Sequence, residues 1–152
     1  MNFSHLRRLE VKEANHIVTS QFHGKENIGE GRTLLWSGET QRRGGVGLFL
    51  NSFTQKALLS FTPISSRLLR ARIDGNHGKI TVFTCYAPTN KAKDDDLSSE
   101  LSSVSPHDYL KVIGDFNAGV ANNSGLYNAA VGPVTADALN DNGERLVDYC
   151  IT

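Results

Sequence analysis

The sequence predicts a layered α/β fold in which short strands form a mixed sheet. Two observations lead to this prediction. Short apolar runs bounded by glycine, proline and asparagine recur from residue 33 onward, which is typical of buried strands. Two later stretches have the pattern of helices, one of them beginning with acidic residues. The resulting order of strand, strand, strand, helix and strand is typical of layered α/β proteins.

The composition is that of one globular domain. The chain has 152 residues, 16 basic and 16 acidic side chains, and 39% hydrophobic residues. A chain of this length buries roughly two-thirds of the surface that its unfolded form exposes. Its two cysteines, Cys85 and Cys150, are too few for a disulfide framework and too far apart for a zinc site. No apolar run approaches the ~20 residues that span a bilayer, which argues against a membrane-spanning protein.

The first part of the chain divides into a tail and the start of a sheet. Residues 1–28 are expected to be a poorly specified tail, because their apolar side chains make no clean helical stripe. Residues 23–32 are polar and glycine-rich, which is typical of a loop. The strands that follow are short, and the third is expected to stop at Pro63, since proline has no backbone N–H to donate. The apolar runs that predict these strands lie at residues 33–36, 46–50 and 57–61, with a turn at 42–45.

The middle of the chain contains the clearest hairpin. Residues 67–73 and 79–86 are separated by a turn signal rich in glycine and asparagine, so these two strands are expected to pair antiparallel. The acidic run that follows predicts a helix start, because carboxylates stabilise the first helical turn. The remaining expected elements are a helix from the acidic run 94–96, a buried strand at 109–114, a long loop at 118–142 and a helix beginning at 143.

The segment Gly114-Asp115-Phe116-Asn117-Ala118 carries the main candidate site residues. On extended backbone, Asp115 and Asn117 would point to one side and Phe116 to the core, while Gly114 leaves room for a close backbone approach. A carboxylate beside an amide at a strand end can orient a water molecule and accept its proton. On spacing alone, however, this pattern is more typical of a turn closed by Asx hydrogen bonds.

A second candidate segment, Cys-Tyr-Ala-Pro-Thr-Asn at residues 85–90, ends the strand at 79–86. In layered α/β folds, ligands bind at the strand ends where loops gather. If the strands that end at Tyr86 and Asp115 are neighbours, the tyrosine hydroxyl comes near the carboxylate and can donate to a phosphate oxygen. Taken alone, Tyr86 is better explained as a buried tyrosine before a loop that proline makes rigid.

Together these segments resemble the endonuclease/exonuclease/phosphatase superfamily. Within it, the sequence is most similar to the endonuclease domains of non-LTR retrotransposons and to craniofacial-development-protein-like sequences. The resemblance covers roughly residues 29–150, and its specificity comes from the order of five motifs that are each weak alone. These motifs are Trp36-Ser37-Gly38, Arg-Arg-Gly-Gly-Val-Gly-Leu at 42–48, Tyr-Ala-Pro-Thr-Asn at 86–90, Gly-Asp-Phe-Asn-Ala at 114–118, and Asn-Gly-Glu-Arg-Leu within 142–150.

The resemblance implies a partial four-layer α/β sandwich with mixed, mainly antiparallel sheets, formed by residues 29–152. It also implies hydrolysis of phosphodiesters that depends on Mg²⁺ or Mn²⁺, with the metal neutralising charge on the phosphate. In this scheme Asp115 binds the metal and orients the attacking water. Asn117 holds water and phosphate, and Tyr86 donates a hydrogen bond to the phosphate.

The sequence departs from the family pattern near both of its ends. The family's metal-binding glutamate motif and its closing Ser-Asp-His motif are not recognisable. Losing groups that act as a unit removes many powers of ten in rate. We therefore expect a fragment or degenerate copy of a retrotransposon-type DNA endonuclease, with weak metal binding and little or no catalysis as it stands. The alternatives are a non-catalytic module that binds nucleic acid or protein, and a phosphatase of the same superfamily.

DNA is the candidate partner, through basic residues on the predicted strands. Residues 1–90 hold 12 basic and 6 acidic side chains, and residues 91–152 hold 4 and 10, so the zero net charge hides a split of +6 and −6. On charge alone, an ordinary solvated surface with a split that is partly chance is the better explanation. The basic residues expected to reach DNA phosphates are Arg42, Arg43, Arg70 and Arg72, of which the last two would share one strand face.

Overall fold

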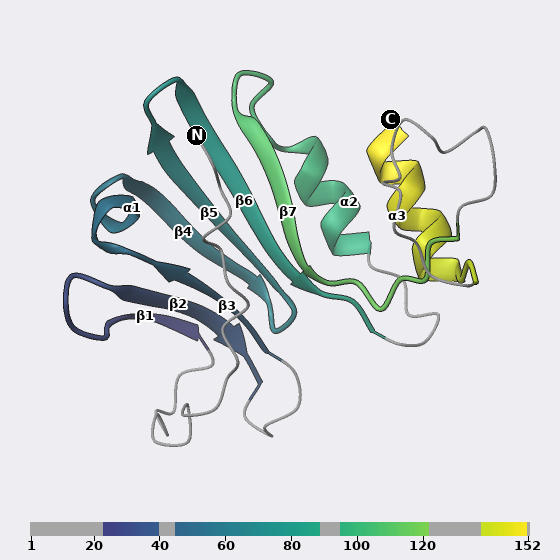
Figure 1. Cartoon of the computed structure of the whole chain (residues 1–152), viewed down its shortest axis with the longest axis horizontal. Coiled ribbons are helices and arrows are strands. Elements are labelled where there is room, and N and C mark those ends of the chain that lie inside the picture. The colour runs from purple at the N-terminus through teal and green to yellow at the C-terminus, as the bar shows by residue number, and fades with distance from the viewer. Residues whose placement is uncertain (1–22, 40–44, 89–94, 122–137, 152) are drawn as a thin grey trace.

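In the computed structural model, the described residues are 23–39, 45–88, 95–121 and 138–151, and they fold into strands and helices (Figure 1). None of the helices in these ranges is long and apolar enough to cross a membrane. The elements are β1 (His23–Asn27), β2 (Thr33–Gly38), β3 (Gly45–Leu50), α1 (Ser52–Lys56), β4 (Leu58–Ser65), β5 (Leu68–Gly75), β6 (Gly78–Tyr86), α2 (Asp95–Ser102), β7 (Tyr109–Asp115) and α3 (Asp141–Ile151).

The strands form two sheets, and the predicted α/β class with mixed, mainly antiparallel sheets is confirmed. The first sheet has the order β1-β2-β3 and is antiparallel throughout. The second has the order β4-β5-β6-β7, in which β6 and β7 are parallel and the other pairs antiparallel. Figure 1 shows the first sheet on one side of the second, with α2 and α3 toward the other side. This arrangement is consistent with a partial α/β sandwich.

The hydrophobic side chains lie on both faces of the second sheet. Along β5, Leu69, Ala71 and Ile73 alternate toward the first sheet, where they pack with apolar residues of β2 and β3. On the other face, Phe83 is fully buried and packs with apolar neighbours that include Leu97 of α2. The second sheet therefore carries a hydrophobic cluster on each face, as the middle layer of a sandwich does.

Most of the expected strands and helices are confirmed at their predicted places. The hairpin is β5 and β6, paired antiparallel from Leu68↔Cys85 to Gly75↔Gly78. The helix expected after the acidic run is α2, and the carboxyl-terminal helix is α3, which starts at Asp141, two residues earlier than expected. The strand expected at 109–114 is β7, but it is half-buried rather than buried, with Tyr109 61% and Leu110 46% exposed. Among the described residues it is the last strand of its sheet and has a neighbouring strand on one side only.

The loop expected at 23–32 is wrong in its first half, because residues 23–27 form β1 and pair with β2. A Cβ atom on Gly24 would lie 2.3 Å from the ring of Trp36, so this glycine makes room for the tryptophan. None of the β1 residues is buried, and their sequence, His-Gly-Lys-Glu-Asn, shows no alternation of apolar and polar side chains. The usual sequence signal of a strand is therefore absent. Residues 1–22 of the expected tail lie outside the described residues, and the division at residue 28 stays a prediction.

The strand end expected at Pro63 is also wrong, since β4 continues to Ser65. Pro63 lies opposite Leu69 in the register, and the register shifts between Pro63 and Ser65. β4 is the first strand of its sheet, and a proline is tolerated there because its missing N–H can face away from the neighbouring strand. The turn expected at 42–45 and most of the loop expected at 118–142 lie outside the described residues.

Candidate functional site

The two candidate segments meet at one end of the second sheet. β6 and β7 are parallel neighbours, and their register places Tyr86 opposite Asp115. Just beyond the pair, the Ala87 N–H donates to the Asp115 carbonyl oxygen at 2.8 Å. The condition that these strand ends are neighbours is therefore met, whereas the chemical roles of the residues stay a prediction.

Gly114 allows the two strands to approach at this point. Its φ angle is +149°, a backbone conformation that residues with a Cβ atom rarely adopt. A Cβ atom built on Gly114 would lie 1.8 Å from the carbonyl oxygen of Cys85 on β6. The close approach expected from the sequence at this glycine is thus confirmed, and it occurs one residue before Asp115.

Asp115 and Asn117 form a tight turn after β7. The Asn117 N–H donates to Asp115 Oδ1 at 3.0 Å, which is the Asx hydrogen bond expected from the spacing. Asn117 has a φ angle of +46°, and its Nδ2 donates to the Ala87 carbonyl oxygen at 2.7 Å. Phe116, between them, packs against the hydrophobic cluster under α2, as expected. The Asp115 side chain is exposed, so the turn presents a carboxylate to solvent beside the end of β6.

Hydrogen bonds from two asparagines connect α3 to this turn. The sequence analysis gave neither asparagine a role. Asn140 Oδ1 accepts from the N–H groups of Gly119 at 3.0 Å and Gly143 at 2.8 Å, and so caps the helix. Its Nδ2 donates to the Asn117 carbonyl oxygen at 3.0 Å. The signal available in the sequence was the Asn-Gly-Glu-Arg-Leu motif, which begins two residues later.

Asn142 belongs to that motif and joins the two strand ends directly. Its Nδ2 donates to the carbonyl oxygens of Pro88 and Phe116, both at 3.0 Å. Pro88 follows β6 and Phe116 follows β7, so one amide connects α3 with both candidate segments. The positions of Tyr86 and Asp115 relative to each other thus depend on a residue 27 positions after Asp115.

Replacing Asn142 with alanine is expected to lower the free energy of unfolding by about 1–3 kcal/mol, because two half-buried carbonyl oxygens lose their donor. The measurement is urea denaturation followed by circular dichroism. Asn76→Ala, in the exposed turn between β5 and β6, is the matched control and should change stability by less than about 0.5 kcal/mol. Equal effects of the two substitutions would show that Asn142 does not join the strand ends.

The described residues supply only part of the ligand set of a magnesium ion. Mg²⁺ prefers six oxygen ligands in near-octahedral geometry, with one or two carboxylates in most protein sites. No three His, Cys, Asp or Glu side chains in the described ranges lie close enough together to hold a metal. Asp115 supplies one carboxylate, and its Oδ1 already accepts a hydrogen bond within the turn.

Two of the arginines expected to reach DNA are paired with acids. Arg70 Nη1 lies 2.9 Å from Glu100 Oε2 of α2, and Arg72 donates to both oxygens of Asp108. Both arginines point to the α2 side of the sheet, so the expectation that they share one face is confirmed. Their charge is compensated there by the two carboxylates. Arg42 and Arg43 lie outside the described residues, and DNA binding stays a prediction.

Comparison with known proteins finds a limited similarity. No family model matches the chain. Craniofacial development protein 2 of Tragulus javanicus and that of Bos taurus are each 29% identical to the chain over 119 residues. The match covers 74% of this chain and 20% of each relative, so the chain spans about a fifth of the length of the curated relatives it matches. The predicted similarity to craniofacial-development-protein-like sequences is confirmed, and the wider superfamily stays a prediction.

Proposed function

We propose that the chain carries part of a phosphodiesterase centre of the retrotransposon-endonuclease type, with weak or no activity by itself. The observation that carries this proposal is the register of β6 and β7, which makes Tyr86 and Asp115 direct neighbours at the same sheet end. Asn117 lies next to them, fixed through its side chain to the residue after Tyr86. The order of the five sequence motifs gives independent support.

The three side chains have complementary chemistry toward a phosphodiester and a water molecule. The Tyr86 hydroxyl can donate to a non-bridging phosphate oxygen, and the Asp115 carboxylate can orient a water and accept its proton. Asn117 donates its amide N–H to Ala87, which leaves its side-chain carbonyl oxygen to accept a hydrogen bond from water. A divalent cation would supply charge neutralisation at the phosphate when bound.

The low activity in this proposal follows from how the same groups serve the fold. One oxygen of Asp115 and the amide of Asn117 are held in hydrogen bonds that shape the turn. Asp115 is also the single carboxylate in the turn of residues 114–118. The candidate catalytic groups therefore also close a turn, and only one carboxylate in that turn is available to a cation. We expect such a centre to stabilise the transition state poorly.

We expect the wild-type chain to nick supercoiled plasmid slowly, if at all, with Mg²⁺ or Mn²⁺. Asp115→Asn is expected to abolish this nicking, because the amide cannot accept a proton. Asp74, an exposed aspartate of β5, lies at the other end of the hairpin, opposite Lys79. Asp74→Asn is therefore the matched control and should nick at the wild-type rate. If Asp115→Asn nicks at the wild-type rate, the carboxylate has no part in the proposed reaction. Rapid turnover by the wild-type chain would contradict the proposed weak activity.

A second measurement applies if the wild-type chain shows no nicking. Adding Mn²⁺ with a short DNA duplex is then expected to broaden the backbone NMR signals of Asp115 and Asn117 before those of the distant Asp74. A duplex that binds in a salt-sensitive way, equally well with Asp115→Ala and without this broadening, would instead favour the non-catalytic binding module. That alternative is consistent with the structural role of the Asx turn.

A further inference from the structure

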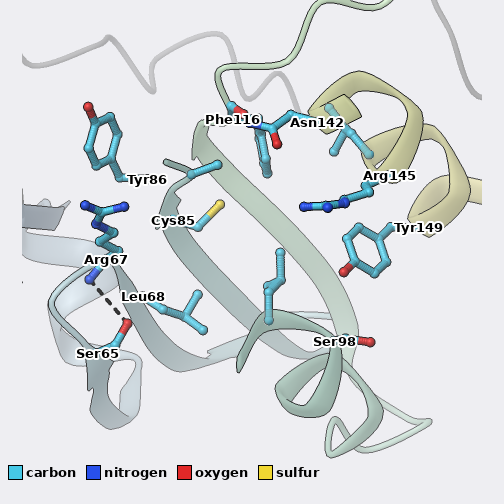
Figure 2. Close-up of a pocket in the computed structure, with 13 residues that line it drawn as sticks. Ser65, Arg67, Leu68, Cys85, Tyr86, Ser98, Phe116, Asn142, Arg145 and Tyr149 are labelled. Carbon is cyan, nitrogen blue, oxygen red and sulfur yellow. Dashed lines mark hydrogen bonds between the residues drawn. The ribbon is translucent and has the colours of Figure 1, made fainter. Parts of the chain in front are cut away.

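A cavity of about 280 Å³ lies on the α2 and α3 side of the second sheet, next to the Asp115–Asn117 turn but not lined by either residue (Figure 2). Leu68 of β5 and Cys85 of β6 contribute lining from the sheet. Leu97 of α2, Leu146 of α3 and Phe116 add apolar surface around it. The volume is just below the ~300 Å³ at which pockets for small organic ligands begin, so the cavity suits a compact molecule.

Arg67 and Arg145 bring two positive charges to this cavity from different parts of the fold. Figure 2 shows the Arg145 side chain extending from α3 into the cavity, with Arg67 across from it beneath the ring of Tyr86. The Arg67 Cζ atom lies 5.8 Å from the centre of that ring, which orients the guanidinium. The two cations therefore line the same concave site.

Neither guanidinium group forms an ion pair with an acid in the part of the chain that the structure describes. Arg70 and Arg72, on the same face of the same sheet, are each paired with a carboxylate. Two half-buried arginines that line a cavity without such a partner attract an anion, since a guanidinium can bind phosphate or carboxylate oxygens with two hydrogen bonds.

The charge and the lining together define the class of ligand. A phosphate monoester carries close to two negative charges at neutral pH, because its second pKa is ~6, and so matches two guanidinium groups. The hydroxyl of Tyr149 points into the cavity from α3 and can donate a further hydrogen bond (Figure 2). The leucines, Phe116 and the tyrosine rings offer surface for a flat, apolar body.

We propose that this cavity binds a small aromatic phosphate monoester, with the phosphate held by Arg145 and Arg67 and the ring against the apolar wall. The site uses different groups from the proposed phosphodiesterase centre, apart from the ring of Tyr86. Binding is therefore independent of Asp115, and the two proposals can fail separately.

Isothermal titration calorimetry of the full chain with phenyl phosphate tests this proposal. Binding is expected for the wild-type chain, and Arg145→Gln and Arg67→Gln should each weaken it roughly tenfold or more, the size of one lost charge-assisted contact. Lys56→Gln, the same change of charge at an exposed position on α1, should leave the affinity unchanged. Asp115→Asn should also bind normally, which separates this site from the proposed reaction.

Inorganic phosphate and benzoate are the comparison probes. Phosphate that binds as tightly as phenyl phosphate would overturn the role of the apolar wall, and benzoate that does so would overturn the preference for a dianion. Absence of binding by the wild-type chain, or equal affinities of Arg145→Gln and Lys56→Gln, would overturn the site itself. Circular dichroism of both arginine variants verifies that they fold, and Arg67, in the turn between β4 and β5, gives a second test if α3 is disturbed.

Discussion

Alanine in place of Gly114 is expected to destabilise the chain by about 3 kcal/mol, the upper range for a side chain forced into a rarely populated backbone conformation. Gly114 has a φ angle of +149°, and a Cβ atom there would lie 1.8 Å from the Cys85 carbonyl oxygen. That oxygen belongs to the backbone of β6, so relief of the clash requires β7 to move away. The end of the sheet that holds Tyr86 opposite Asp115 would then open.

The matched control for this prediction is Gly47→Ala in β3. A Cβ atom on Gly47 would have its nearest neighbour at 3.4 Å, which is ordinary contact. We expect thermal unfolding midpoints about 10 °C lower for Gly114→Ala and nearly unchanged for Gly47→Ala. Amide hydrogen exchange should show the loss of protection concentrated at the ends of β6 and β7. Similar midpoints for the two variants would contradict the close approach of these strands.

The sequence predicts the strand ends of the candidate site because their signals are local. An apolar run that ends in Tyr86 and another that ends near Asp115 are visible as short periodic segments. The Asx turn follows from two residues spaced two apart. What the residues alone leave open is whether the two strands are neighbours, and the structure shows that they pair in parallel.

The partners of these segments could not be predicted, because they come from distant parts of the chain. Asn142 connects the segments after β6 and β7 by donating to two carbonyl oxygens. No local sequence pattern predicts the hydrogen-bond partners of such an asparagine. Arg70 and Arg72 look like a basic surface in the sequence, yet their carboxylate partners lie 30 and 36 positions later. β1 was missed since it buries no apolar side chain.

The pairing of arginines also changes what the basic half of the chain can do. The charge split of +6 and −6 left open a basic surface for DNA. In the fold, acids of the second half neutralise Arg70 and Arg72, whereas Arg67 and Arg145 face a cavity. Arg67 and Arg145 thus offer positive charge inside a cavity of limited volume, which is why we propose a small phosphate there rather than a polymer.

Asp108→Asn is expected to lower the thermal unfolding midpoint at neutral pH more than removal of any exposed carboxylate. The Asp108 side chain is only 2% exposed, and its oxygens accept from Arg72 Nε at 2.6 Å and Nη2 at 2.8 Å. Thr81 Oγ1 on β6 donates to the same carboxylate at 2.9 Å. An asparagine would offer one acceptor in place of two and turn its own N–H groups toward a cation, leaving a half-buried arginine without its partner.

The effect should depend on pH in a direction set by the pKa of Asp108. The hydrogen bonds from Arg72 hold that pKa below its usual value, with smaller contributions from Thr81 and Lys79, against the opposing effect of burial. A carboxyl whose pKa is lower in the folded chain stabilises the fold above its unfolded pKa of ~3.9, and this stabilisation is lost as the pH falls through the folded pKa. The difference in unfolding midpoint between wild type and Asp108→Asn should therefore be largest at neutral pH and shrink below about pH 4.

Asp74→Asn, at an exposed site on the same hairpin, should show little difference from wild type at any pH. A gap for Asp108→Asn that stays constant through this acid range would mean that the carboxylate charge does not hold β5, β6 and the start of β7 together.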